Sequence, residues 1–180
     1  MSSPIFSCYN TSMSTPIAIG ISACLLGRNT RYDGGHMHAP LLVEALEQSV
    51  TLIPLCPEAE CGLGIPREPM HLEGDPDNPR LITVHTRCDL SERMQIWIDQ
   101  RLDMLAGEAV GGLILKARSP SCGKRVAVHG AEENASSPGL FVRGIMERFP
   151  DLPIADEEEL RDPAGLADFL ARLPGPHPEK

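Results

Sequence analysis

Three cysteines each follow an apolar, strand-like run at the point where the run breaks into a loop rich in Gly or Pro. They are Cys24 in ISACLLG, Cys56 in LIPLCPE and Cys122 in LKARSPSCGK. In an open α/β sheet, strand ends of the same polarity meet at one crevice, where such folds bind their ligands. Three thiolates gathered there could hold a metal ion or a cluster and leave one coordination position free. Alternatively, each cysteine is a small buried hydrophobe, a common role of the free residue.

Two other kinds of cysteine site stay open. A zinc site prefers four ligands that include a close CxxC pair, which this chain lacks, although Cys61 and His71 could complete a shell around Cys56. A catalytic thiol needs a partner base, and no single histidine is tied to one cysteine by the sequence. The candidate bases are His36, His38 and His129. The remaining cysteines, Cys8 and Cys88, are expected to be incidental.

A carboxylate and two hydroxyls lie close in sequence to these cysteines. Glu58 is two residues after Cys56 and could act as a general acid or base if it is partly desolvated, or could simply cap a turn. Ser119 and Ser121 flank a proline just before Cys122. Their hydroxyls, with the backbone N–H groups of that loop, could bind an anion or orient a substrate.

Basic side chains gather beside the cysteines of an acidic chain, whose formal net charge is −9. The segment KARSPSCGKR around Cys122 holds two of the three lysines, two arginines and no acid. Such clustering predicts a small anion such as phosphate or carboxylate, unless the charges only aid solubility or lower thiol pKa values. The candidate substrate-binding residues are Arg28, Lys116, Arg118, Ser121, Gly123 and Lys124, with Arg31, Arg67 and Arg125 nearby.

Alternating strand and helix signals must position these residues. Buried strands are expected at 17–24 and 50–55, joined by a helix that Pro40 opens, which is a right-handed βαβ unit. A long helix capped by Asp89 or Ser91 leads to a third buried strand at 112–115. We expect irregular structure at 57–79, an edge strand or hairpin arm at 80–86, a helix in LFVRGIMERF, a short strand in LPI and a closing helix in PAGLADFLARL.

These elements predict an α/β fold: a single Rossmann-like domain over residues 16–174, with a mostly parallel sheet flanked by helices and cysteines at the carboxyl ends of its strands. We expect residues 1–15 to be a flexible extension and 175–180 a frayed tail. No apolar run approaches a membrane span, and the irregular cysteine spacing favours reduced thiols, so we expect a cytoplasmic protein. We also expect a monomer or a homodimer, a choice that the sequence leaves open. The net charge of −9 and the aromatic content of 4% disfavour stable nucleic-acid binding.

Three motifs occur in order over Ile17 to Ile154: SACLLGxxxRYDGG, then CPE with GLGxPR, then LKARSPSCG. Together they resemble the family that includes the bacterial thiouracil desulfidases. The resemblance implies a [4Fe-4S] cluster held by Cys24, Cys56 and Cys122 with one iron open, and removal of sulfur from thiolated pyrimidines without net redox change. It also implies that Glu58 is the acid/base and Ser119 the substrate-orienting hydroxyl.

Cys61 is a departure from the family pattern, because relatives more often have glycine in this loop. As a fourth ligand it would close the open iron.

The resemblance and the basic cluster together predict a substrate. A phosphate would meet the basic side chains that a free base cannot use, so we expect conversion of 4-thiouridine 5′-monophosphate to UMP and hydrogen sulfide, in salvage of thiolated tRNA nucleotides. The alternative substrate is free 2-thiouracil. The rivals from other classes are a non-catalytic iron–sulfur or zinc protein and a cysteine hydrolase.

Overall fold

Four parallel strands form the central sheet of the computed structural model, which describes residues 16–174. In spatial order they are β2 (Val50–Leu55), β1 (Ile17–Ser22), β5 (Val110–Leu115) and β8 (Ile154–Asp156). The chain adds β2 on one side of β1 and β5 on the other, so the strand order reverses at β1. In such sheets the binding crevice lies outside the carboxyl ends of the strands at this reversal. The expected extension at 1–15 and tail at 175–180 lie outside the described residues.

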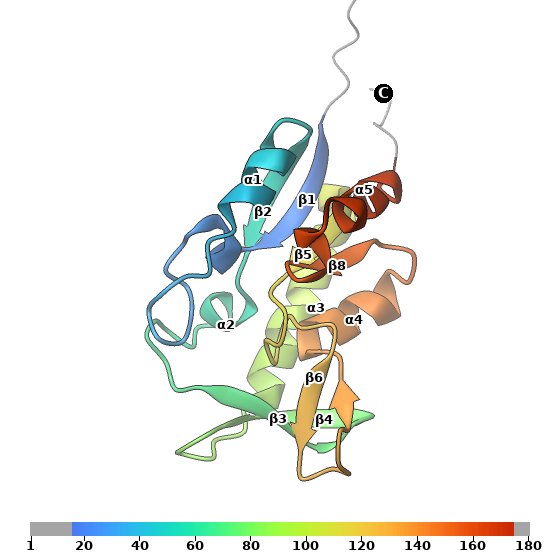
Figure 1. The fold of residues 1–180 in the computed structure, drawn as a ribbon. Helices are drawn as coiled ribbons and strands as arrows, with labels where there is room; N and C mark the ends of the chain where they lie inside the picture. Colours follow the sequence, from blue (N-terminus) through green and yellow to red (C-terminus); the bar gives the residue numbers. More distant parts are fainter. Residues whose placement is uncertain (1–15, 175–180) are drawn as a thin grey trace, which may run out of the picture.

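Helices cover both faces of this sheet (Figure 1). Side chains of α3 (Ser91–Glu108) and α4 (Leu140–Arg148) share one core with Leu113 and Leu115, whereas α1 (Pro40–Glu47) and α5 (Pro163–Ala171) share the other with Ile114. Successive β5 residues therefore enter opposite cores, as the two-residue period of a strand requires. The predicted mixed α/β architecture, a parallel sheet flanked by helices, is confirmed.

A second, mixed sheet was not predicted. Its order is β4 (Asn78–Thr83), β3 (Met70–Asp75), β6 (Val126–His129) and β7 (Ser136–Ser137). The expectation of irregular structure over 57–79 is wrong, because α2 (Pro57–Glu60) and β3 lie within it. β3 has only one buried residue, Leu72, so it lacks a hydrophobic pattern and depends on pairing with β4 and β6. The hairpin arm expected at 80–86 is confirmed as β4.

Two short 3-10 helices follow strands of the central sheet, one after β1 and one after β8. β1 stops at Ser22, two residues before the expected end, and Cys24 lies on η1 (Ala23–Leu26). η2 (Glu159–Arg161) follows β8. Within residues 16–174, no helix has the length and apolar character that crossing a membrane requires.

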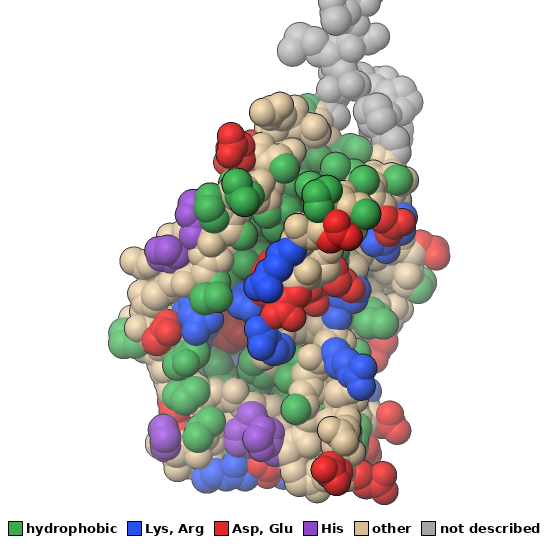
Figure 2. All heavy atoms as spheres, in the orientation of Figure 1, with side chains coloured by type: hydrophobic (Ala, Val, Ile, Leu, Met, Phe, Trp, Pro, Cys, Tyr) green, Lys and Arg blue, Asp and Glu red, His purple; other side chains and the backbone are tan. Residues whose placement is uncertain are grey.

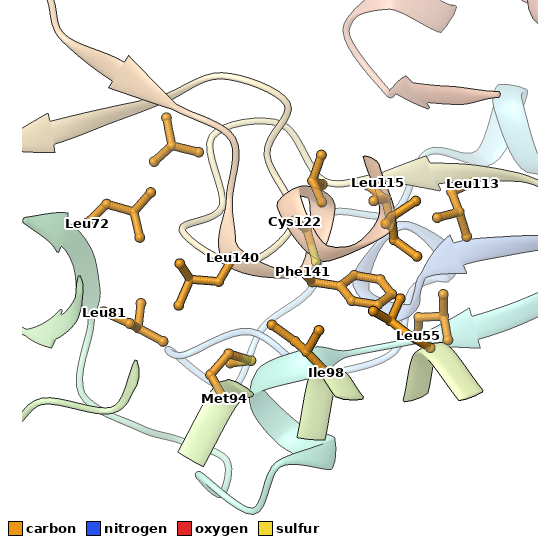
Figure 3. Packing of buried hydrophobic residues seen from close by; sticks show 14 of the residues in the cluster. Leu55, Leu72, Leu81, Met94, Ile98, Leu113, Leu115, Cys122, Leu140 and Phe141 are labelled. Atoms are coloured by element: carbon orange, nitrogen blue, oxygen red, sulfur yellow. The ribbon is translucent and has the colours of Figure 1, made fainter. Parts of the chain in front are cut away.

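The loop after β5 wraps around the first turn of α4. The N–H groups of Leu140 and Phe141 donate to the carbonyls of Pro120 and Ser121, at 3.1 and 3.0 Å, which satisfies donors that a helix N-terminus leaves free. A Cβ atom at Gly139 would lie 2.6 Å from the Ser121 carbonyl carbon and oxygen, so only glycine allows this approach. Cys122 is held in the loop and packs into the core near Phe141 (Figure 3).

Candidate active site

Cys24, Cys56 and Cys122 line one cavity of about 420 Å³. Cys24 lies on η1 after β1, Cys56 directly follows β2, and Cys122 lies in the loop after β5. The cavity therefore lies outside the carboxyl ends of the three strands that meet at the order reversal. The second sheet contributes to its wall through Met70.

Glu58 is the buried carboxylate of this cavity, exposed by only 7%. Its position on the first turn of α2 is favoured by the helix dipole, and Pro57 opens that turn. Oε1 of Glu58 accepts a hydrogen bond from the Ser119 hydroxyl at 3.1 Å, and Oε2 lies 3.7 Å from the Cys56 sulfur. A carboxylate, a hydroxyl and a thiol from three separate segments thus meet at one point.

Ser119 fixes its hydroxyl through the following loop. Its Oγ accepts the backbone N–H groups of Ser121 at 3.2 Å and Cys122 at 3.1 Å, a local side-chain to backbone motif. The hydroxyl proton is directed toward Glu58. Ser119 therefore connects the carboxylate on α2 with the backbone of Cys122.

Arg67 lines the cavity, whereas the sequence analysis gave it only as a basic side chain near the candidate binding residues. Its Nη1 donates to the carbonyls of Thr30 at 3.0 Å and Gly64 at 3.2 Å, and its Nη2 lies 3.9 Å from Oε2 of Glu58. The side chain is 8% exposed. The only sequence signal for this role is the GLGxPR motif, since no periodic element surrounds it.

The three thiols lie close enough to influence one another's ionisation. Burial, then the charges of Cys56 and Glu58, raises the pKa of Cys24 to about 11. Burial, then the charges of Glu58, Cys56 and Cys24, raises the pKa of Cys122 well above its usual range. A bound cation would favour the thiolates, because metal binding releases thiol protons.

The donor set distinguishes between kinds of metal centre. Within residues 16–174, no three His, Cys, Asp or Glu side chains are spaced to bind a single metal ion. This disfavours the single zinc ion left open by the sequence. A [4Fe-4S] cluster suits the cavity better, because its thiolate ligands bind different irons and stand further apart.

The basic cluster has acidic partners that the local sequence did not show. Three consecutive glutamates after β8 each bind one of its members. Lys116 pairs with Glu157, Arg118 with Glu158 at 2.5 Å and Lys124 with Glu159 at 2.6 Å. Figure 2 shows acidic and basic side chains mixed near the middle of this face. Lys116 and Arg118 line the cavity, but their charges are compensated.

The other predicted substrate-binding residues lie outside the cavity lining. Arg28 is exposed, and Lys124 contacts Glu159 instead. Ser121 is fully buried, and a Cβ atom at Gly123 would lie 2.9 Å from the Ser119 carbonyl oxygen. Ser121 and Gly123 thus belong to the packed interior of the loop.

Cys61 and the second-sheet histidines also lie outside the cavity lining. Cys61 lines a separate hollow of about 380 Å³ against α3, and its thiol donates to the Glu58 carbonyl at 3.4 Å. His71 and His129 contact each other on the second sheet, with ring centroids 4.4 Å apart. The exposed Cys88 is likewise remote.

The fold and the site define an α/β protein whose binding crevice is lined by three thiols and a buried carboxylate. The model of the 2-thiouracil desulfurase family matches residues 19–157, and the chain belongs to that family. The uncharacterized protein YbbK of Bacillus subtilis (strain 168) is 25% identical over 147 residues, which are 79% of this chain and 97% of that protein.

A solved structure has the same fold. The [4Fe-4S]-dependent thiouracil desulfidase TudS matches with a TM-score of 0.66 and 27% identity, over 87% of this chain and 99% of that chain. The expected family is therefore confirmed, and desulfidase activity toward thiolated pyrimidines is supported at the level of the family.

Proposed function

We propose that this protein is a [4Fe-4S]-dependent desulfidase in which Cys24, Cys56 and Cys122 hold the cluster. The observation that carries the proposal is the cavity lined by these three thiols, with Glu58 against Cys56 at 3.7 Å. The similar structure is that of a [4Fe-4S]-dependent enzyme. The location of Cys61 in a separate hollow supports three protein ligands rather than four.

With three protein ligands, a bound cluster would have one open iron, which would act as a Lewis acid toward a soft sulfur atom and polarise the carbon–sulfur bond. The protein's own residues then handle water and protons. Glu58 removes one proton from the water that attacks the ring carbon and passes it to the departing sulfur. The proton of the hydroxyl formed by this attack also goes to sulfur, as the carbon–sulfur bond breaks and the carbonyl forms. Carbon exchanges sulfur for oxygen, hydrogen sulfide leaves, and no electrons are gained or lost.

Ser119 orients the carboxylate for this task. Its hydroxyl donates to Oε1 of Glu58, so Oε2, which faces Cys56, is left to accept the water proton. The same hydroxyl is held by two loop N–H groups and is not free to rotate. Loss of this contact should lower turnover while the cluster stays bound.

For the substrate, we propose 4-thiouridine 5′-monophosphate from turnover of thiolated tRNA nucleotides, with free 2-thiouracil as the second candidate. Arg118 supports the nucleotide, because it lines the cavity while 75% exposed and pairs with a half-exposed Glu158. Exposed pairs of this kind are worth about 0–1 kcal/mol, so a phosphate can displace the glutamate at little cost. The buried Lys116–Glu157 pair favours free 2-thiouracil, because Glu157 already neutralises the Lys116 ammonium and leaves it with no free charge for a phosphate.

Iron, zinc and acid-labile sulfide in anaerobically purified protein test the cofactor. We expect iron with sulfide and a brown chromophore, lost in Cys24→Ser, Cys56→Ser and Cys122→Ser and kept in the matched variant Cys61→Ser. Stoichiometric zinc without sulfide would instead indicate a structural site. Sulfide release without metal, abolished by a thiol alkylator, would indicate a cysteine hydrolase.

The substrate is tested by comparing 4-thiouridine 5′-monophosphate with its nucleoside. Equal kcat/KM for the two would exclude a role for phosphate. Glu58→Ala should keep the iron content and lose sulfide release.

A further inference from the structure

Two polar atoms on one wall of the cavity lack hydrogen-bond partners. They are Oγ1 of Thr30 and Nε of Arg67, and neither has a partner among the residues that the structure describes. Both residues line the cavity. Buried polar groups are nearly always paired. Within residues 16–174, three other buried side-chain atoms without partners belong to residues outside the cavity lining, so what distinguishes Thr30 and Arg67 is that both line the cavity, where a ligand could supply the missing partners.

The rest of the Arg67 guanidinium is already fixed. Nη1 donates to the carbonyls of Thr30 and Gly64. The edge of the guanidinium formed by Nε and Nη2 is therefore left to donate to a ligand. Nη2 lies 3.9 Å from Oε2 of Glu58. The unused edge is therefore held next to the proposed general base, which is where the reacting ring must lie.

We propose that Arg67 and Thr30 bind the edge of a uracil-type ring beside its thiocarbonyl group, and this inference rests on the proposed function. Arg67 donates to the ring carbonyl oxygen. Thr30 accepts the N–H that lies between the carbonyl and the thiocarbonyl. Closure of the two side chains onto the ring gives both unpaired atoms a partner.

A neutral carbonyl fits this wall better than a phosphate. The Glu58 carboxylate lies against the same guanidinium, so a dianion there would be repelled by a buried like charge. A phosphate would also need several donors, whereas Nη1 is already engaged. The phosphate of a nucleotide would instead lie toward Arg118, on the exposed side of the cavity.

This arrangement predicts rejection of a cytosine-type ring. In 2-thiocytosine, an amino group replaces the carbonyl and the adjacent ring nitrogen carries no proton. Arg67 would then face a donor, and a polar site left unpaired rejects such an analogue strongly. We expect wild-type kcat/KM for 2-thiouracil to exceed that for 2-thiocytosine by at least about 100-fold.

Thr30→Val and Arg67→Lys test the assignment. Valine keeps the shape and removes an unpaired hydroxyl, so the melting temperature should not fall, while kcat/KM for 2-thiouracil drops about 10-fold. Arg67→Lys should lower it about 100-fold and reduce discrimination against 2-thiocytosine. The matched controls Thr51→Val and Arg80→Lys lie outside the cavity lining, and all variants should keep wild-type iron content and visible spectrum.

The outcomes separate the two proposals. Sulfide release from neither 2-thiouracil nor 4-thiouridine 5′-monophosphate by wild-type protein refutes the proposed function. Release with no preference for 2-thiouracil over 2-thiocytosine, or a preference that survives in both variants, overturns the roles of Arg67 and Thr30 alone. Should Arg67→Lys fail to fold, Thr30→Val decides, because it removes no hydrogen bond from its side chain.

Discussion

Gly139→Ala tests whether contact with the N-terminus of α4 positions the cysteine loop. The new Cβ would lie 2.6 Å from the Ser121 carbonyl carbon and oxygen and 2.9 Å from the Cys122 nitrogen. These neighbours are backbone atoms, and the hydrogen bond from Gly139 N–H to the Gly123 carbonyl, 2.8 Å long, holds the same loop. The loop and the helix must therefore separate, and Cys122 must move.

The size of the effect follows from the neighbours that are crowded. Overpacking costs about 1–3 kcal/mol, and we expect the upper end because backbone cannot turn aside. For a chain of this length, about 3 kcal/mol lowers the melting temperature by about 6–12 °C. The matched control is Gly107→Ala in α3, where the added Cβ meets nothing within 4 Å. It should gain up to about 1 kcal/mol from helix propensity.

The assay is thermal unfolding followed by circular dichroism, together with iron content after anaerobic purification. Gly139→Ala should be less stable than wild type and should bind less iron, whereas Gly107→Ala should match or exceed wild type in both. A Gly139→Ala protein with wild-type melting temperature and full iron content would refute the reasoning, because Cys122 would then tolerate displacement of its loop.

Three further predictions concern charge and thiol access. Hydrogen bonds from Arg87 and His71 lower the pKa of Glu73 from its ordinary value of 4.5 to about 2. The ionised Glu73 therefore stabilises the fold above pH 4.5, and this contribution is lost as the pH falls toward 2. In Arg87→Ala the melting temperature should vary less with pH over that range. Glu157→Gln removes the counter-charge of the buried Lys116 ammonium and should cost about 3 kcal/mol in urea unfolding, and a change below about 1 kcal/mol would contradict this. In metal-free protein, iodoacetamide should label the exposed Cys88 before the buried Cys122, as judged by peptide mass mapping.

Parts of the site could be predicted because they depend on local rules. Cys24 and Cys56 each follow a strand of the parallel sheet, and parallel strands end at the same edge of a sheet. The strand before Cys56 was expected to be buried, but β2 is the edge strand and only Val50 and Leu55 are buried in it. Glu58 could be identified because it is two residues from a candidate ligand. Continuous apolar runs likewise indicated β1 and β2, and Pro40 at the start of an amphipathic segment indicated α1.

The remainder depends on pairing between distant segments. Glu157 reaches Lys116 because β8 lies beside β5 in the sheet. The basic segment around Cys122 contains no acid, so its sequence alone does not show that glutamates after β8 compensate its charges. Arg67 lies between α2 and β3, two elements without a clear hydrophobic period, so only the GLGxPR motif could point to its place in the cavity. The second sheet was missed for the same reason.

The bond from the Lys116 backbone N–H to the Ser22 hydroxyl joins residues 94 positions apart, where β1 and β5 lie side by side. The same pairing brings the thiols of Cys24 and Cys122 to one cavity. If these are the cluster ligands, as proposed, a growing chain lacks the complete set until Cys122 has been synthesised and β5 has docked. With the proposed ligands, cofactor loading follows folding and then stabilises the folded chain by mass action. The cellular lifetime of this protein would therefore depend on iron supply.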